Sequence, residues 1–342
     1  MEAPREAVAR LSDVARHAGV SSKTVSRVVN HEPNVRPQVR EAVMRSVTAL
    51  GYRPNAAARA LVTQRTHQIG LVTSASALYG PTAGLFSLEQ AAWKAGYTLT
   101  FTTVRTPSEP DLTDAVADLI SRGVEGVLIS AATSALHLDP SVLAGMPVVS
   151  SNPVVEGAGN QVIVDADQKM GARSAMGHLF ELGHRHIAHI AGPLNWNAAV
   201  QRRAGWLDFI AEAGAVPGPV FQGDWSAKSG YQAGLELAGT GVRAVFAAND
   251  HMAMGAMRAL EDRGLSIPHE ISVIGFDDVP EAPYQIVPLT TVRQDFALTA
   301  ERSVSELVRL IDGSEIQESR ILLPTELIVR ESTARAPSTA LS

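Results

Sequence analysis

Beyond about residue 67, short apolar runs alternate with amphipathic segments for more than 250 residues. The apolar runs predict buried strands, and segments with apolar residues three and four apart predict helices. Strands are predicted at IGLVTS (69–74), YTLTFTTV (97–104), GVLIS (126–130), MPVVSS (146–151), IAHIAG (187–192), AVFAAN (244–249) and ISVIGF (271–276), with a further strand near Ile321–Pro324 that returns to the first lobe. Helices are predicted at about 83–95, 111–122, 167–182, 198–213, 227–238, 251–263 and 296–312. This alternation predicts parallel sheets with right-handed crossovers, arranged as two similar lobes.

The N-terminal part has a different pattern, with three short amphipathic helices and no predicted strand. The first helix is expected over about 12–18, and Gly19 supplies a tight turn. The second follows Ser21, whose hydroxyl can accept a hydrogen bond from the first turn. The third opens at Pro37, where a missing N–H costs little, and ends at Gly51.

The second of these helices has one apolar and one polar face. Its apolar residues are Val20, Val25, Val28 and Val29. Its other face is polar and cationic, and carries Ser22, Lys23, Ser26, Arg27 and Asn30. Lysine or arginine with short polar side chains suits a helix lying in the major groove of DNA. The pattern therefore predicts a helix-turn-helix; a helical hairpin with a solvated outer face is the alternative.

A short alanine-rich segment, AAARAL (56–61), follows, with Asn55 as a candidate N-cap. Its helix propensity is high, but it is too short to be stable alone. A helix that forms only when docked would act as a hinge, and Leu61 is its only large apolar residue. The alternative is a plain linker.

Charge is divided unevenly along the chain, which carries −6 overall. Residues 1–66 contain eleven Lys and Arg and five Asp and Glu, so this segment carries +6 and the remainder −12. A basic head on an acidic body is the electrostatic pattern expected of a DNA-binding domain attached to a sensor. Cysteine is absent, and neither an apolar run of 18 residues nor a secretory leader is evident. We therefore expect a cytoplasmic, nucleoid-associated protein.

Distinctive residues, most of them polar or aromatic, follow predicted strands or lie near the start of the helices that come next. They are Ser74, Leu78, Arg202, Trp225, Asn249 and Asp277. Ligands of open parallel sheets bind outside the carboxyl ends of strands. A guanidinium, a carboxylate, an amide and an indole are the groups that hold a sugar, because planar groups bind hydroxyl pairs and an aromatic face stacks on the ring. Taken singly, each residue could instead be a helix cap, a core anchor or a surface residue.

Two other groups of residues are candidate chemical sites. Asp277 and Asp278 are a candidate acid–base pair, but adjacent side chains usually point apart and no nucleophile motif accompanies them. His184, His186 and His189 are candidate metal ligands, but on a strand they would divide between two faces. No phosphate-binding glycine motif is present. We expect neither an enzyme nor a bound cofactor.

SDVARHAGVSSKTVSRVVN, LGYRPNAAARAL, GHRHIAHIAGP, ANDHMAMGAMRAL and ISVIGFDD together resemble the lactose-repressor (LacI/GalR-type) family of bacterial transcription regulators. GDWSA and LTTVRQDF look closest to the lactose-repressor branch. The resemblance implies a helix-turn-helix head at 9–54, a hinge helix and linker at 55–66, a two-lobed effector-binding and dimerisation core at 67–332, and a flexible tail at 333–342. The core is expected to resemble periplasmic sugar-binding proteins, with lobe 1 at about 67–162 and 296–323 and lobe 2 at about 165–292 and 324–332.

The resemblance also implies a function. Such regulators bind near-palindromic double-stranded operators as homodimers, usually repress, and release DNA when a small sugar or glycoside binds. Residues expected at DNA are Ser12, Ser21, Ser22, Lys23, Thr24, Ser26, Arg27, Asn30, Asn55, Arg59 and Leu61, the last as a minor-groove wedge. Residues expected at the effector are Ser74, Leu78, Asn152, Ala198, Arg202, Trp225, Asn249, Asp277, Gln294 and Phe296.

Several positions depart from that branch. Ser22 and Lys23 stand where the lactose repressor has an aromatic residue and an amide, so a different operator sequence is expected. Asn152 replaces an aspartate and Ala198 a serine, so the sugar need not be the same galactoside. The branch's C-terminal tetramer helix is not found, which predicts a dimer. A corepressor-dependent regulator that binds a purine, and a sugar-binding protein of a transport system, are the alternatives.

Overall fold

The computed structural model describes residues 9–30, 33–53, 60–61, 63–104, 108–130, 138–143, 145–154 and 161–336. The chain divides into two compact units, Met1–Thr66 and His67–Ser342. Within the described ranges, no helix is both long enough and apolar enough to cross a membrane.

The first unit is a three-helix bundle. Its helices are α1 (Leu11–Ala18), α2 (Ser22–Val29) and α3 (Pro37–Ala49). The turn between α1 and α2 depends on Gly19, whose φ of 65° is a conformation that side chains disfavour. One valine or more from each helix fills the core, with Val14, Val25, Val28 and Val43 fully buried. The predicted helices and their apolar stripes are confirmed here.

The second unit contains two six-stranded sheets with the same strand order. The first runs β11-β5-β4-β3-β1-β2 and the second β12-β10-β9-β8-β6-β7. The strands of the first are β1 (Gln68–Ser74), β2 (Thr98–Val104), β3 (Val127–Ser130), β4 (Val148–Ser150), β5 (Gln161–Ala166) and β11 (Arg320–Leu323). Those of the second are β6 (His186–Ala191), β7 (Val216–Gln222), β8 (Ala244–Ala247), β9 (Ser272–Asp277), β10 (Thr290–Arg293) and β12 (Glu326–Ile328).

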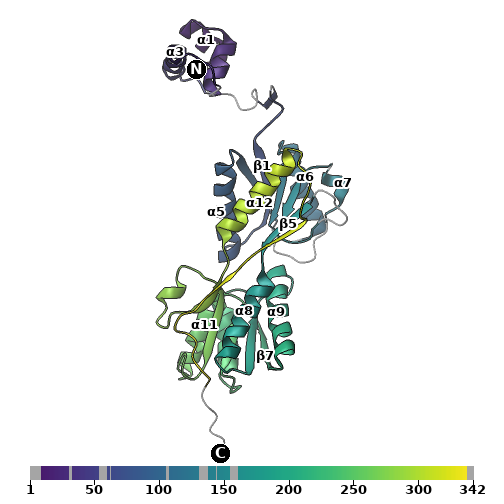
Figure 1. Ribbon diagram of the computed structural model, residues 1–342, viewed down its shortest axis with the longest axis vertical. Helices are drawn as coiled ribbons and strands as arrows, with labels where there is room; N and C mark the ends of the chain where they lie inside the picture. Colours follow the sequence, from purple (N-terminus) through teal and green to yellow (C-terminus); the bar gives the residue numbers. More distant parts are fainter. Residues whose placement is uncertain are drawn as a thin grey trace, which may run out of the picture. The chain divides into compact units, whose positions relative to one another are not determined.

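Every strand pairing in both sheets is parallel except that of β12 with β10. The chain passes from the first sheet to the second after β5, returns through α12 (Phe296–Ile311), and passes again between β11 and β12. Figure 1 shows this last passage as the yellow segment running between the two sheets. The two-lobed α/β fold class predicted from the sequence is confirmed.

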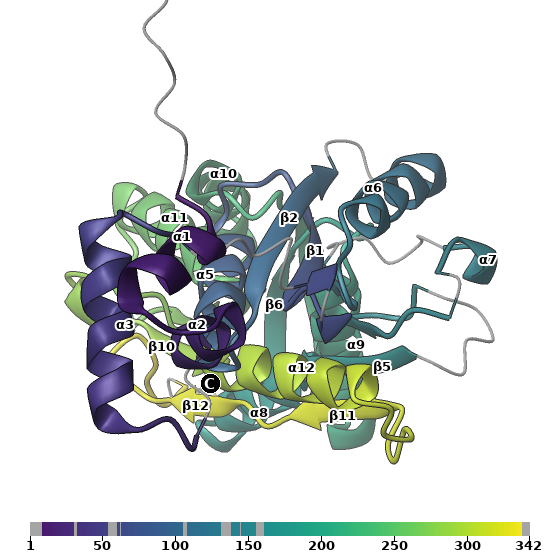
Figure 2. The same cartoon turned by 90° about the horizontal axis from the view of Figure 1, so that it is seen from above.

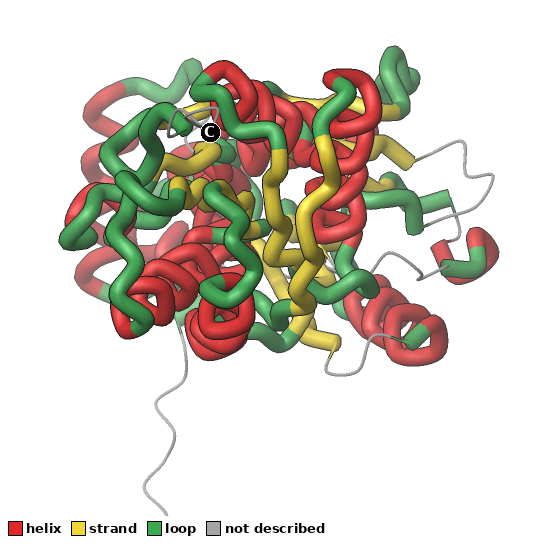
Figure 3. The backbone as a smooth tube through the Cα atoms, turned by 90° about the horizontal axis from the view of Figure 1, so that it is seen from below, coloured by secondary structure: helices red, strands yellow, loops and turns green. Residues whose placement is uncertain are grey.

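Helices cover both faces of each sheet (Figure 3). On the first sheet, α5 (Tyr79–Lys94) and α12 pack on one face and α6 (Glu109–Ser121) on the other, with the short α7 (Pro140–Leu143) beside α6. Helix α12 lies along β5 (Figure 2). On the second sheet, α8 (Gln168–Glu181) and α9 (Asn197–Ala213) oppose α10 (Ala227–Leu237) and α11 (Asp250–Asp262). A short 3-10 helix spans Ala282–Tyr284.

The observed strands differ from the predicted ones in two ways: some strands were not predicted, and some are shorter than expected. Strands β5, β7, β10 and β12 were not predicted as strands. The predicted strand at 244–249 ends early, at Ala247, because Asn249 caps α11. The predicted strand at 146–151 is reduced to Val148–Ser150.

Candidate ligand-binding and DNA-binding sites

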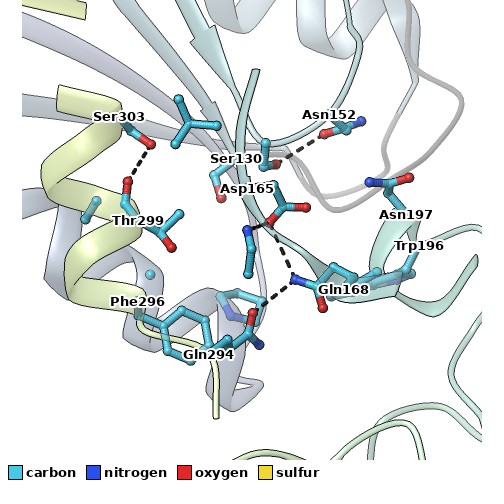
Figure 4. Close-up of a pocket in the computed structure, with 18 of the residues that line it drawn as sticks. Ser130, Asn152, Asp165, Gln168, Trp196, Asn197, Gln294, Phe296, Thr299 and Ser303 are labelled. Carbon is cyan, nitrogen blue, oxygen red and sulfur yellow. Dashed lines mark hydrogen bonds between the residues drawn. The ribbon is translucent and has the colours of Figure 1, made fainter. Parts of the chain in front are cut away.

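A cavity of about 200 Å³ is lined by residues that follow the carboxyl ends of strands from both sheets. Its place agrees with the general position of ligands in parallel sheets. Nine of the ten residues expected at the effector line it: Leu78, Asn152, Ala198, Arg202, Trp225, Asn249, Asp277, Gln294 and Phe296. Figure 4 shows part of this lining, with Asn152 and Asp165 on one side and Gln294 and Phe296 on the other. The sequence reasoning therefore brought together residues up to 218 positions apart (from Leu78 to Phe296).

Ser74 is the exception, because the lining does not include it. It is the last residue of β1 and pairs in register with Val104 of β2. The cavity wall on this side begins four positions later, at Leu78, which precedes α5.

Arg202 is the buried cation of the cavity, with 3% of its surface exposed. Its Nη2 lies 3.1 Å from Oδ1 of Asp277, its Nε donates to Oε1 of Gln168 at 2.8 Å, and its Nη1 donates to the carbonyl of Ala248. The guanidinium also lies over the Phe276 ring, 3.7 Å from its centroid. These contacts fix the guanidinium from three sides, so it is preorganised for a ligand.

Asp277 and two glutamines complete this network. Gln294 Nε2 donates to Asp277 Oδ1 at 2.7 Å, and Gln168 Nε2 donates to Gln294 Oε1 at 3.0 Å. Burial raises the pKa of Asp277, while Arg202 and Gln294 act in the opposite direction. Asp277 also has a φ of 115°, a conformation that costs free energy and is typical of functional sites.

Asn249 has a structural role and also lies at the site. Its Oδ1 accepts from the Met252 N–H at 2.9 Å, which caps α11, and its Nδ2 donates to the Trp225 carbonyl at 3.1 Å. The helix-cap alternative weighed from the sequence is thus correct for Asn249, and the same side chain also lines the cavity. It ties the end of β8 to the turn that carries the indole.

Trp225 forms an aromatic wall of the cavity. Its φ is 75°, its exposed fraction is 5%, and its ring meets Trp196 edge-on with centroids 5.7 Å apart. The ring lies so close to Gly192 that a Cβ at that position would overlap it. Glycine at 192 is therefore required for the indole to occupy this position.

Two of the positions expected to depart from the lactose-repressor branch, Asn152 and Ala198, lie in the cavity wall. Asn152 is 2% exposed, and its Oδ1 accepts from Ser151 Oγ at 3.2 Å. Ala198 lies in the first turn of α9, next to Asn197. An amide and a methyl group thus form this part of the cavity wall.

Further lining residues were not singled out from the sequence. They include Tyr79, Ser130, Ser150, Asp165, Gln168, Trp196, Asn197, Thr299 and Ser303. Tyr79 opens α5 and meets Phe296 edge-on at 5.8 Å, and burial together with nearby carboxylates raises its pKa. Asp165 stands near the end of β5, where desolvation raises its pKa to about 7. The position of these residues at strand ends and helix starts was the signal that could have found them.

The other candidate chemistries lie elsewhere. Asp278 accepts from Arg293 at 2.7 Å and from Arg330 at 2.6 Å, so it serves ion pairs and not a pair with Asp277. His184 Nε2 lies 3.1 Å from Ser272 Oγ, and His189 is buried between aromatic rings. His186 at the start of β6 is exposed. Within the part of the chain that the structure describes, these histidines do not converge.

In the first unit, α2 presents the expected polar face. Ser22, Lys23, Arg27 and Asn30 are exposed, and Thr24 and Ser26 are half-buried. Ser21 Oγ accepts from the Thr24 N–H at 3.2 Å and thereby caps the helix as predicted. Ser12 is exposed on α1. Asn55 and Arg59 lie outside the described residues, whereas the Leu61 residue is 85% exposed.

Comparison with known proteins gives two family matches. Residues 10–55 match "Bacterial regulatory proteins, lacI family", and residues 176–333 match "Periplasmic binding protein-like domain". The chain is 35% identical over 340 residues to the lactose operon repressor of Escherichia coli K12, covering 96% of this chain and 91% of the relative.

Two solved structures extend the likeness. A lac repressor dimer bound to operator and the anti-inducer ONPF has a TM-score of 0.84 at 34% identity, covering 96% of this chain and 100% of the other. A complex of the transcriptional regulator CelR with cellobiose has a TM-score of 0.68 at 33% identity, covering 95% and 99%. The chain thus matches regulators along nearly its whole length.

Proposed function

The chain belongs to the LacI family of bacterial regulatory proteins, and we propose that it is a transcriptional repressor that a small sugar or glycoside releases from its operator. It acts as a homodimer on a near-palindromic double-stranded operator, in the cytoplasm at the nucleoid. It is a regulator and not an enzyme.

The DNA-binding role rests on α2. Lys23 and Arg27 give the exposed face two cations, with Ser22 and Asn30 as short hydrogen-bonding neighbours. Cationic and amide side chains on such a helix can donate to guanine acceptors and meet adenine edges in the major groove. The +6 charge of residues 1–66 adds attraction to phosphates, whereas the −12 charge of the rest opposes unspecific binding by the core.

The effector role rests on the cavity. Arg202 and Asp277 hold each other in place, and their remaining polar atoms can bind hydroxyls as donor and acceptor. Trp225 offers the apolar surface on which a sugar ring stacks. One buried arginine stands beside the carboxyl groups of Asp165 and Asp277, which favours a neutral polyol over an anion.

The observation that carries the proposal is that one chain holds both a helix with an exposed cationic face and a cavity with a sugar-binding set of side chains. Because residues of both sheets line the cavity, a ligand that binds them together favours one arrangement of the lobes. A change in the lobes that separates the hinge segments of the dimer would then weaken operator binding.

A mobility-shift assay with the DNA upstream of the protein's own gene tests the function. We expect a discrete complex with that fragment, which one member of a panel of mono- and disaccharides weakens. Footprinting of the same complex identifies the half-sites. If a purine tightened the complex and no sugar weakened it, the protein would be a corepressor-dependent regulator instead.

Leu61 is assigned the role of a minor-groove wedge at the operator centre, and its exposed apolar side chain is available for it. Leu61→Gly is expected to weaken binding to the operator by at least about tenfold and binding to random DNA far less, because unspecific binding is largely electrostatic. The check is a titration of both duplexes at one salt concentration. Comparable losses on the two duplexes would refute the wedge.

A further inference from the structure

A second cavity, of about 410 Å³, adjoins the effector cavity. The two share five lining residues: Ser151, Asp165, Ala166, Gln168 and Asn197. They come from the ends of β4 and β5 and the first turns of α8 and α9. The two cavities therefore adjoin one another along this wall.

Asp165 is the acidic side chain at this junction. Its Oδ1 accepts from the Ala166 N–H at 2.8 Å and from Gln168 Nε2 at 3.5 Å. Both of these hydrogen bonds are made to Oδ1 and leave Oδ2 on the other side of the carboxyl group. Figure 4 shows the carboxyl group between Asn152 and Gln168 in the cavity wall. A carboxylate oxygen with free lone pairs in a partly desolvated wall is a strong acceptor for a ligand hydroxyl.

The second cavity has a polar, nearly charge-balanced lining. Its ionisable residues are Asp165, Asp167, Lys169, Arg173, Asp208, Glu212 and Arg320, four acids and three bases. Two of the bases are already paired, Lys169 with Asp208 at 2.5 Å and Arg173 with Glu212 at 2.6 Å. A lining of this kind offers donors and acceptors without a net positive field, so it suits a neutral polyhydroxyl group better than a phosphate or a carboxylate.

We propose that the second cavity is a subsite for the second sugar unit of a disaccharide effector, with Asp165 accepting a hydrogen bond from a hydroxyl at the junction. This inference rests on the proposed sugar-responsive function. In this arrangement the first cavity holds one sugar ring against Trp225, between Arg202 and Asp277. The second ring passes Asp165 and lies over α8 and α9, facing Ile163, Arg320 and Leu322 of the first sheet. The protein is then selective for disaccharides over their component monosaccharides.

A bulky substitution on α9 that fills the second cavity tests the subsite. Gln201 is half-buried and lines the second cavity but not the first, so Gln201→Trp fills the proposed subsite and leaves the Arg202 network in place. Leu207→Trp is the matched control, because Leu207 is on the same helix, is 44% exposed and lines neither cavity. Thermal unfolding of both variants shows that each is folded.

Isothermal titration of the full-length protein with cellobiose, lactose, maltose, glucose and galactose provides the readout. We expect at least one disaccharide to bind about tenfold or more tightly than its monosaccharides, since a second set of charge-assisted hydrogen bonds is worth that much. Gln201→Trp should lose this advantage and keep monosaccharide affinity, while Leu207→Trp should match the wild type. Asp165→Asn should lower disaccharide affinity by about tenfold.

Two results overturn the subsite while leaving the sugar-responsive function intact. One is a monosaccharide that binds as tightly as any disaccharide. The other is an equal effect of Gln201→Trp on both classes of sugar. If none of the five sugars binds the wild type, both the subsite and the sugar-effector proposal are refuted. That outcome is distinct from the first two.

Discussion

At the scale of single residues, the cavity is built from groups that the protein keeps partly desolvated. Asp165 and Asp277 both have raised pKa values, in each case mainly through burial. Arg202 has a lowered pKa for the same reason. Burying these groups opposes folding, since desolvation disfavours the charged form. The buried ionisable groups of the cavity therefore lower the stability of the folded protein, and the same groups are available to bind a polar ligand.

The pH dependence of stability tests how much the burial of Asp165 destabilises the folded protein. Its pKa is about 7 in the folded protein, against about 3.9 in an unfolded chain. The folded state therefore binds more protons between these values, so stability falls as pH rises from about 4 to 7 and stays reduced above 7. The full effect is roughly 4 kcal/mol at most, and water in the cavity reduces it.

Urea unfolding of the wild type and Asp165→Asn at pH 5 and pH 8 measures this effect. The wild type should lose more stability between the two pH values than the variant, because asparagine does not titrate. Asp250 and Asp277 contribute in the same direction but are present in both proteins, so the difference isolates Asp165. An identical pH dependence in the two proteins would show that Asp165 is solvated in the folded state.

Arg202 and Asp277 form the buried ion pair of the site, with side chains 4% and 6% exposed. Arg202→Ala should abolish the response to the sugar and destabilise the core by about 3–5 kcal/mol, because it leaves a buried carboxyl without its partner. Adding Asp277→Asn should recover part of this stability but none of the sugar binding. DNA binding by the folded variants should remain, as measured by mobility shift. Recovery of sugar binding in the double variant would mean that Arg202 serves folding alone.

At the scale of elements, helices were predicted more completely than strands. All seven helices expected after residue 67 are present within a few residues of their expected ends. The missed strand β7 is an edge strand with the sequence VPGPVFQ, and its two prolines argued against a strand although an edge tolerates them. Strands β10 and β12 have only four and three residues. Their sequences, TTVR and ELI, lack the apolar run that indicated the equally short strands β3, β4 and β8.

The residues that line the cavity also differ in how readily the sequence indicates them. Trp225, Asn249 and Asp277 could be found because they end apolar strands or sit in conspicuous turns. Asp165 and Gln168 stand at the end of β5 and the start of α8, and they were missed because β5 was not predicted as a strand. Their partners, Arg202 and Gln294, come from distant segments that only the tertiary structure brings together.

Substitutions of Asn249 can separate its role as a helix cap from its role in the cavity. Serine caps a helix about as well as asparagine, whereas alanine costs about 1 kcal/mol. Both substitutions remove the Nδ2 bond to the Trp225 carbonyl. Asn249→Ser should therefore keep near wild-type stability and Asn249→Ala should lose about 1 kcal/mol, while both weaken sugar binding. Thermal unfolding and tryptophan fluorescence titration provide the two readouts, and normal sugar binding by Asn249→Ser would contradict the cavity role.

At the scale of the whole molecule, the two units carry opposite charge, with +6 in residues 1–66 and −12 in the remainder. Operator binding should therefore weaken steeply with salt, whereas binding of a neutral sugar should be almost insensitive to it. The two activities meet only through the conformation of the protein. Their coupling is consequently a property of the complete chain and must be measured on it.

Thermodynamic linkage fixes how that coupling must behave. If the sugar weakens operator affinity by some factor, the operator must weaken sugar affinity by the same factor, typically about 5- to 150-fold. Tryptophan fluorescence titration of the sugar, alone and with saturating operator duplex, should show this loss. A scrambled duplex of equal length is the control, and it should leave sugar affinity nearly unchanged. Because a ligand with equal affinity for two states shifts neither, equal sugar affinity with and without operator would exclude induction through the core and leave the cavity without a regulatory role.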